Sequence, residues 1–381
     1  MSNTVIFMIK YKNCYNKFQA SSHSLEEVVL RQQPKGFFMN NDYSDTTIVP
    51  DEVIIKKGRS SYSITAFGLF TFGIVSTLAQ IICQIILILL IKKYPSLKTE
   101  EWINYIEILI PMYVIAFPTS FLVFRLSPKN PPKSEKMSFS KLLSFFVMMI
   151  PLTLILNMLS ILLADFLSDG SATNPINDII TDVNIWQIST VVILAPIVEE
   201  TLFRKFIIDR TRAYGEKLSI FFSALCFGLF HMNIFQIFYA FALGFILAYI
   251  YIRTGRIRYT IILHMIFNFW GSVVPLKVSS LMSDSLLNAI ESGDSNLLFD
   301  TLTNDQIIGV IIYFLYIFIE IGLFVAGIIM WICFIAGKKA QFMPAQMELP
   351  AKKRFRTAFV TLGFLFFFAL CAYGTVTNFL M

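Results

Sequence analysis

Charged residues are scarce in this sequence: only 15% of its 381 residues are Asp, Glu, Lys or Arg, whereas 56% are hydrophobic. Soluble domains carry about 25% charged residues, so this deficit excludes an ordinary soluble protein. The charges stand between apolar runs long enough to cross a bilayer as helices, and these runs lack the alternation of a membrane β-barrel. We therefore expect an all-α polytopic membrane protein, a bundle of about eight or nine transmembrane helices.

Cysteine and histidine are also rare, and neither occurs in a metal-binding pattern. The five cysteines show no metal-site spacing and no disulfide framework, and four of them lie in apolar runs where a small hydrophobic residue is the ordinary interpretation. No His-Glu-x-x-His segment is present, so we expect no metal and no cofactor. We find neither a cleavable signal nor a lipid-anchor motif.

Basic residues are concentrated in alternate connections between the apolar runs. The net charge of +6 is therefore a topology signal, and we expect no nucleic-acid partner. One side of the membrane receives 21 Lys and Arg and the other receives four, which predicts a cytoplasmic N-terminus and an outer C-terminus. The nine expected spans cover residues 63–91, 105–126, 139–163, 187–208, 218–233, 234–251, 259–274, 307–335 and 358–379.

The chain divides into two predicted parts. Residues 1–60 form a polar cytoplasmic segment without recognisable chemistry, and residues 61–381 form the membrane domain. The outer loops 166–186 and 278–305 are rich in Ser, Asn and Asp. We expect them to be solvated, with at most one short amphipathic helix in the sequence SLLNAI.

The span 187–208 contains adjacent carboxylates, Glu199 and Glu200, with Arg204 one turn later. Ionisable groups at membrane depth cost roughly 2.5 kcal/mol or more each, so they are seldom incidental. Glu200 and Arg204 are spaced i, i+4 and can pair as a structural ion pair. Glu199 points about 100° away, without that partner, and its position suits a general base. Pro196 removes one backbone hydrogen bond just before this site.

Two further motifs follow in the next spans. Phe227 and His231 are one turn apart in LSIFFSALCFGLFHMN, and His264 and Asn268 are one turn apart in RYTIILHMIFNFW. A lone membrane histidine is most often a packing residue. Here, however, Glu199, His231, His264 and Asn268 are all expected within about 6 Å of the middle of a ~30 Å hydrocarbon core. They can therefore share one intramembrane cavity.

The ordered set Glu-Glu-x-x-x-Arg, Phe-x-x-x-His and His-x-x-x-Asn resembles the CPBP membrane proteins, also called the Abi or CAAX-protease family, which includes the Ras-converting CAAX prenyl endopeptidase. The resemblance covers about residues 199–268, within a catalytic core of about 187–275. It implies a glutamate-type intramembrane endopeptidase that cleaves a membrane-associated peptide or protein, for which a C-terminal or lipidated segment is one candidate.

The resemblance also implies a role for each motif residue. Glu199 would be the catalytic carboxylate, and His231 would help it to activate water. His264 and Asn268 would form the oxyanion hole. The supporting residues would be Glu200, Arg204 and Phe227.

Three other interpretations remain open at this point. The chain could be a bacteriocin-immunity or scaffold protein of the same family that binds without cleaving. It could be a proton- or ion-coupled transporter, although no internal repeat of hydropathy is visible. It could also be a zinc peptidase with Glu and two His as ligands, without the usual motif.

Two features lie outside the three motifs. Glu320 stands near the middle of the eighth span, where it could pair with a basic group or line a cavity. Ala240 and Gly244 form a small-residue face in the sixth span, for which close helix packing is the ordinary explanation.

Overall fold

The structure is a computed structural model that describes residues 49–100, 102–174, 183–293, 296 and 303–380. All regular structure in these ranges is helical, which confirms the expected all-α class. Most of the predicted N-terminal segment, including His23, lies outside the described residues, and the proposed domain boundary at residue 60 stays a prediction. The long helix α2 already begins at Asp51.

Seven helices are long and apolar enough to span a membrane within the described ranges, so the chain is a multi-pass membrane protein. Two of the nine expected spans, 187–208 and 218–233, are absent from that set. The second corresponds to α10, a helix of only 15 residues. The element order is α2 Asp51–Lys93, η1 Pro95–Thr99, α3 Trp102–Leu109, η2 Ile110–Ala116, α4 Phe117–Phe124, α5 Phe139–Ser168, α7 Ile185–Gln187, η3 Ile188–Leu194, α8 Ala195–Glu200, η4 Thr201–Ile208, α9 Asp209–Thr211, η5 Arg212–Tyr214, α10 Glu216–Phe230, α11 Ile234–Thr254, α12 Ile257–Asn268, η6 Phe269–Val273, α13 Val274–Ser279, α14 Asp284–Ser292, α16 Asn304–Ala336, η7 Ala351–Lys353, α17 Arg354–Phe359 and α18 Leu362–Leu380.

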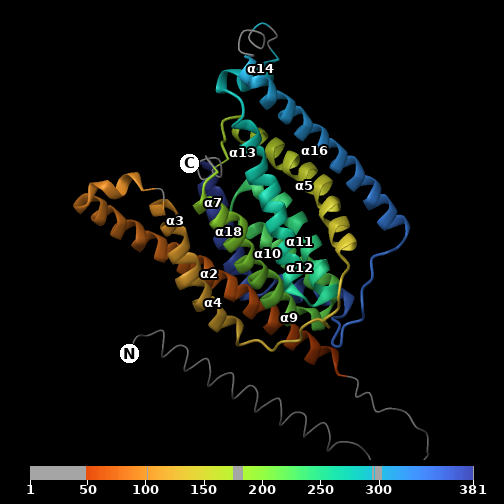
Figure 1. Ribbon diagram of the computed structural model, residues 1–381. Helices are drawn as coiled ribbons and strands as arrows, with labels where there is room; N and C mark the ends of the chain where they lie inside the picture. The colour runs from red at the N-terminus through yellow and green to blue at the C-terminus, as the bar shows by residue number, and fades with distance from the viewer. Residues whose placement is uncertain (1–48, 101, 175–182, 294–295, 297–302, 381) are drawn as a thin grey trace, which may run out of the picture. The chain divides into compact units, whose positions relative to one another are not determined.

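The centre of the bundle is the hairpin formed by α10 and α11 (Figure 1). Helix α5 packs on α11, and α16 packs in turn on the outside of α5. Helix α2 packs against α18 and against the η2–α4 segment. The segment α8, which carries Glu199, packs against α12, and η4, which follows it, packs against α10 and α11.

Small residues allow α10 and α11 to approach closely. A Cβ added at Gly228 would lie 2.7 Å from the carbonyl oxygen of Ile237, and one added at Gly244 would lie 2.9 Å from the Phe227 ring. Ala240 is buried on the same face of α11. The predicted packing role of this small-residue face is confirmed, and the packing fixes the position of Phe227.

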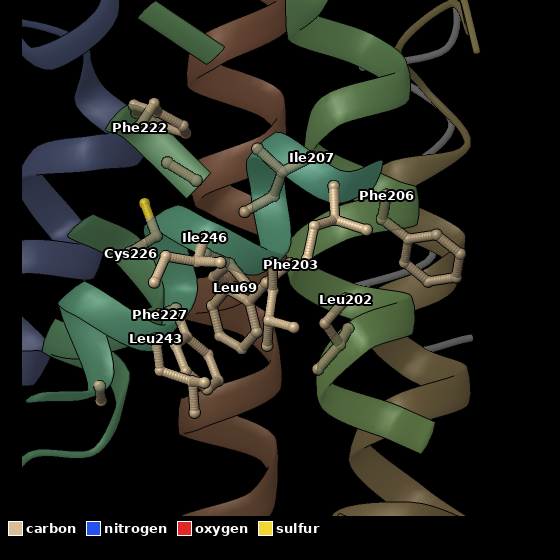
Figure 2. Close-up of a cluster of buried hydrophobic side chains, with 14 of the residues drawn as sticks. Leu69, Leu202, Phe203, Phe206, Ile207, Phe222, Cys226, Phe227, Leu243 and Ile246 are labelled. Carbon is tan, nitrogen blue, oxygen red and sulfur yellow. The ribbon is translucent and has the colours of Figure 1, made fainter. Parts of the chain in front are cut away.

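A layer of large apolar side chains joins η4, α10, α11 and α2 beside the candidate site. Phe203 and Phe227 meet edge to face with ring centroids 5.1 Å apart. Burying a large aromatic or aliphatic side chain contributes roughly 1.5–3 kcal/mol, so this layer holds the η4 segment firmly. Figure 2 shows its labelled members, Leu69, Leu202, Phe203, Phe206, Ile207, Phe222, Cys226, Phe227, Leu243 and Ile246.

The helix that carries Glu199 and Glu200 is interrupted by π-helical turns on both sides. The segments η3 and η4 flank α8, and η6 follows Asn268 directly. A π turn shifts a helix out of the regular i→i−4 hydrogen-bond pattern and frequently accompanies a functional site. The predicted outer helix is also present as α14, which contains SLLNAI.

Candidate active site

Glu200 and Arg204 form the predicted ion pair. The Nε atom of Arg204 lies 3.0 Å from Oε2 of Glu200, and both side chains are completely buried. The other carboxylate oxygen, Oε1, lies 3.0 Å from Nδ1 of His264. Both oxygens of Glu200 are therefore engaged by partners from η4 and α12, and this carboxylate is a fixed structural group.

The guanidinium of Arg204 also lies over the face of the Phe227 ring, 4.4 Å from the ring centroid. None of its three guanidinium nitrogens has a hydrogen-bond partner among the described residues, so its contact with Glu200 is an ion pair without hydrogen-bond geometry. A desolvated cation over an aromatic face gains about 2 kcal/mol, which offsets part of the cost of burying those donors. Arg204 is thus held by Glu200 on one side and by Phe227 on the other.

Phe227 contacts both histidines of the predicted motifs. Its ring stands edge to face with the imidazole of His231 at 4.9 Å between centroids, and with that of His264 at 5.7 Å. The ring therefore lies between side chains that come from the end of α10 and from α12. The structure brings the three motifs together around this phenylalanine.

Glu199 differs from its neighbour in exposure and in partners. Its side chain is 24% exposed, whereas that of Glu200 is fully buried. Oε2 of Glu199 lies 3.7 Å from Nε2 of His264, too far for a hydrogen bond. Its carboxylate lies within electrostatic range of His231, Tyr113 and Tyr239. Glu199 is therefore the accessible carboxylate of the pair.

The hydrogen bond of His231 fixes its tautomer. Its Nδ1 lies 2.8 Å from the carbonyl oxygen of Phe227, which is one turn earlier. A carbonyl oxygen can only accept, so Nδ1 must carry the proton that it donates. The Nε2 atom of the neutral ring is then a hydrogen-bond acceptor. Local helix geometry therefore prepares His231 to accept a proton or a hydrogen bond.

Asn268 is anchored by a backbone group that Pro196 leaves free. Its Nδ2 donates to the carbonyl oxygen of Val191 across 2.9 Å. In the π segment η3 the N–H of Ala195 donates to Thr190, five residues earlier. The next bond of that pattern would run from residue 196 to Val191, but a proline has no N–H. Asn268 therefore donates to the Val191 carbonyl, to which Pro196 cannot donate. The side-chain amide of Asn268 has a second N–H that this bond does not use.

Sequence reasoning missed two side chains near the site. Tyr113 in η2 and Tyr239 in α11 both lie within electrostatic range of Glu199, and no spacing motif marks either of them. Glu320, which the sequence singled out without a defined partner, accepts a hydrogen bond from the indole of Trp270 across 2.6 Å, so this observed partner is a neutral donor and not a basic group. The only sequence feature that could have indicated these contacts is the presence of a tyrosine or tryptophan within an apolar span.

Comparisons with known proteins agree with the motifs. Residues 181–270 match the family described as "Type II CAAX prenyl endopeptidase Rce1-like". Over 89 residues the chain is 35% identical to the protein of Bacillus subtilis (strain 168) named "Putative membrane peptidase YdiL"; the match covers 22% of this chain and 35% of that protein. No solved structure matches the chain. The resemblance to CPBP membrane proteases is thereby confirmed for the segment that contains all three motifs.

Proposed function

We propose, on the premise that residues 181–270 share the Rce1-like sequence pattern, that this chain is a membrane-embedded endopeptidase in which Glu199 activates water. The observation that carries the proposal is the contrast between the two adjacent carboxylates. Glu200 is fully buried with both oxygens engaged, whereas Glu199 is partly exposed, lies beside the imidazole of His264 and is within electrostatic range of His231. Only Glu199 can take a proton from a water molecule that also contacts a substrate.

His231 supports this role by offering an acceptor. A water molecule between Glu199 and Nε2 of His231 would donate one proton to each group, which leaves an oxygen lone pair for attack on a carbonyl carbon. The bond from Nδ1 to the Phe227 carbonyl keeps Nε2 in the required form. Glu199 then receives the proton of the attacking water and delivers it to the leaving amine when the C–N bond breaks.

The seventh span would supply donors for the negative charge on the former carbonyl oxygen. Asn268 uses one N–H to hold its position on Val191 and keeps the other for the oxyanion. His264 would supply a second donor from Nε2, which requires this nitrogen to carry a proton in addition to Nδ1, the nitrogen that faces Glu200. Such donors act only on charge that develops in the transition state, so they accelerate the reaction without tightening substrate binding.

The substrate class follows from the location of the site. Glu199 lies on α8 between two membrane-spanning helices in the sequence, and His264 and Asn268 lie within a third, so the scissile bond belongs to a membrane-associated peptide or protein segment, with a segment near a lipidated end as one candidate. We place the chain in the cell membrane with its N-terminus in the cytoplasm, because the basic residues collect on that side.

A zinc-dependent alternative receives no support from the arrangement of ligating groups. Within the described ranges no group of three or more His, Cys, Asp and Glu side chains could hold a metal ion. His264 instead directs one ring nitrogen to a carboxylate that Arg204 already neutralises. A glutamate base with histidine and asparagine partners accounts for these contacts more directly.

The activity can be tested before a substrate is known. Membrane-associated peptides from cells that carry the wild-type chain are compared by mass spectrometry with those from cells that carry Glu199→Ala. We expect a small set of peptides with new termini that is present only with the wild-type chain. Identical peptide sets, together with a wild-type phenotype of the Glu199→Ala cells, would favour the binding-only immunity or scaffold function.

A further inference from the structure

Met232, the residue directly after His231, has a left-handed backbone conformation, with φ at 48°. In this conformation the Cβ atom of an L residue lies too close to the following carbonyl oxygen, so residues other than glycine seldom adopt it. It persists only where the surrounding structure holds the residue, and such residues are concentrated at functional sites. The contacts that hold Met232 are therefore of interest for the site beside it.

Met232 is the single residue between two helix caps. His231 caps the C-terminus of α10, and Asn233 caps the N-terminus of α11. The backbone N–H of His231 donates to Gly228 across 3.3 Å, and that of Met232 donates to Leu229 across 3.1 Å. Both bonds reach back three residues instead of four, so the last turn of α10 is tight. The conformation at Met232 thus sets how α10 ends and where its last side chain points.

Helix α18 holds both the backbone and the side chain of Met232. Nδ2 of Asn378 donates to the Met232 carbonyl oxygen across 3.0 Å. Gly374, one turn earlier on the same face of α18, leaves space for the Met232 side chain. A Cβ added at Gly374 would lie 2.5 Å from Sδ of Met232 and 3.1 Å from its Cβ and Cγ. Neither contact can be kept if the turn at Met232 changes its direction.

From these contacts we infer that Gly374 and Asn378 are positioning residues for His231. They keep Met232 in the left-handed conformation, and the turn then presents His231 with its Nδ1 bonded to the α10 backbone across 2.8 Å. The inference rests on the role proposed for His231. It gives a part in the site to α18, which lies outside the matched residues 181–270.

The imidazole of His231 can be observed without a substrate. The chain has three histidines, so nitrogen-15 labelling of histidine gives few signals, and that of His231 is the one missing from His231→Gln. The spectrum distinguishes a ring nitrogen that carries a proton from one that does not. We expect a protonated Nδ1 and a bare Nε2 in the wild-type chain, because Nδ1 faces a carbonyl oxygen.

Asn378→Leu removes the donor and keeps the approximate size of the side chain. Without this bond the backbone at Met232 can relax to negative φ, and the end of α10 then turns. We expect the His231 signal to change from one tautomer to a mixture in which Nε2 also carries the proton. The signal of His264 on α12 should stay as in the wild-type chain, which makes it an internal control.

Two further variants of α18 test whether the effect is local. Gly374→Ala crowds the Met232 side chain and should change the His231 signal in the same way. Val376→Ala alters a residue of the same helix that is 55% exposed, and it should leave the spectrum unchanged. A wild-type His231 signal in either Asn378→Leu or Gly374→Ala would overturn the inference. An equally large change of the His264 signal would overturn it too.

Met232→Gly tests whether Asn378 acts through the strained residue. Glycine adopts positive φ without a steric cost, so the turn no longer needs the bond from α18. Asn378→Leu should therefore change the His231 signal in the wild-type background and leave it unchanged in the Met232→Gly background, as expected for coupled residues. Equal changes in both backgrounds would show that Asn378 does not act through Met232, and the inference would fail.

The outcome is separable from that of the proposed function, because the spectrum does not depend on hydrolysis. With a cleavable peptide, we expect Asn378→Leu to lower kcat by about tenfold with KM unchanged, since a displaced catalytic group loses its alignment. If Asn378→Leu changes the His231 signal but His231→Ala keeps full peptidase activity, the proposed role of His231 fails and the positioning stands. If His231→Ala is inactive and Asn378→Leu gives the wild-type spectrum, only the present inference fails.

Discussion

The side-chain amide of Asn268 is bound to the backbone carbonyl of Val191, across 2.9 Å and 77 positions of sequence. This contact connects the predicted oxyanion residue to the helix that carries Glu199. It exists because Pro196 cannot donate to that carbonyl, so a proline three residues before the proposed catalytic carboxylate determines where an asparagine from another span is held. A small shift of the helix that carries Glu199 should therefore also move the side chain of Asn268.

Pro196→Ala tests this connection. The new backbone N–H can bond to Val191, and Asn268 then loses its anchor. We expect turnover to fall by about tenfold, because a catalytic group that moves by even part of an ångström loses its alignment, while the melting temperature is unchanged or higher. Turnover and melting of the purified protein are measured beside Pro118→Ala, which replaces an exposed proline of α4 and should behave as wild type. Full activity of Pro196→Ala would show that the anchor is dispensable.

Glu200→Gln should cost stability first. The substitution leaves the buried Arg204 without its counter-charge, at a position where both side chains have no exposure to solvent. Removing one partner of a buried ion pair typically costs about 3–5 kcal/mol. We expect a clearly lower melting temperature in detergent, and turnover per folded molecule close to that of the wild-type protein. A stable Glu200→Gln protein that had lost its activity would reverse the assignment of the two carboxylates.

Asn268→Ala should lower turnover by about 10²–10³-fold with little change in substrate affinity, because an oxyanion donor acts on charge that appears only in the transition state. The variant is measured by separate determination of kcat and KM. Asn268→Asp should be worse when ionised, since it places an acceptor and a negative charge where a donor is needed and faces the Val191 carbonyl as well. Unchanged kcat with a raised KM would assign this face of the helix to substrate binding.

The direction of the chain in the membrane can be measured by labelling single cysteines with a membrane-impermeant maleimide. Asn288 of α14 and Lys136 before α5 are both exposed, and the charge asymmetry predicts that they lie on opposite sides of the membrane. In intact cells, a cysteine at position 288 should be labelled and one at position 136 should be protected until the cells are opened. The opposite pattern would invert the predicted orientation.

The sequence was sufficient for the helical class, for the Glu200–Arg204 pair and for the three motifs that meet at the site. These features follow from hydropathy and from i, i+4 spacing, which are local properties. The anchoring of Asn268 on Val191 could not be predicted, because it depends on a π turn that no residue pattern marks. The same limit applies to Tyr239, whose approach to Glu199 depends on how α11 packs, and to Glu320, whose partner Trp270 lies 50 positions away.

The most direct test of the account is the turnover of Glu199→Gln. Wild-type and Glu199→Gln proteins are purified, reconstituted in lipid vesicles and given a membrane peptide identified in the cellular comparison, and product formation is followed by mass spectrometry. Glutamine keeps the size of the side chain but cannot accept a proton from water, so we expect turnover to fall by at least ~10³-fold with an unchanged melting temperature. Turnover of Glu199→Gln within a few fold of the wild-type rate would contradict the account.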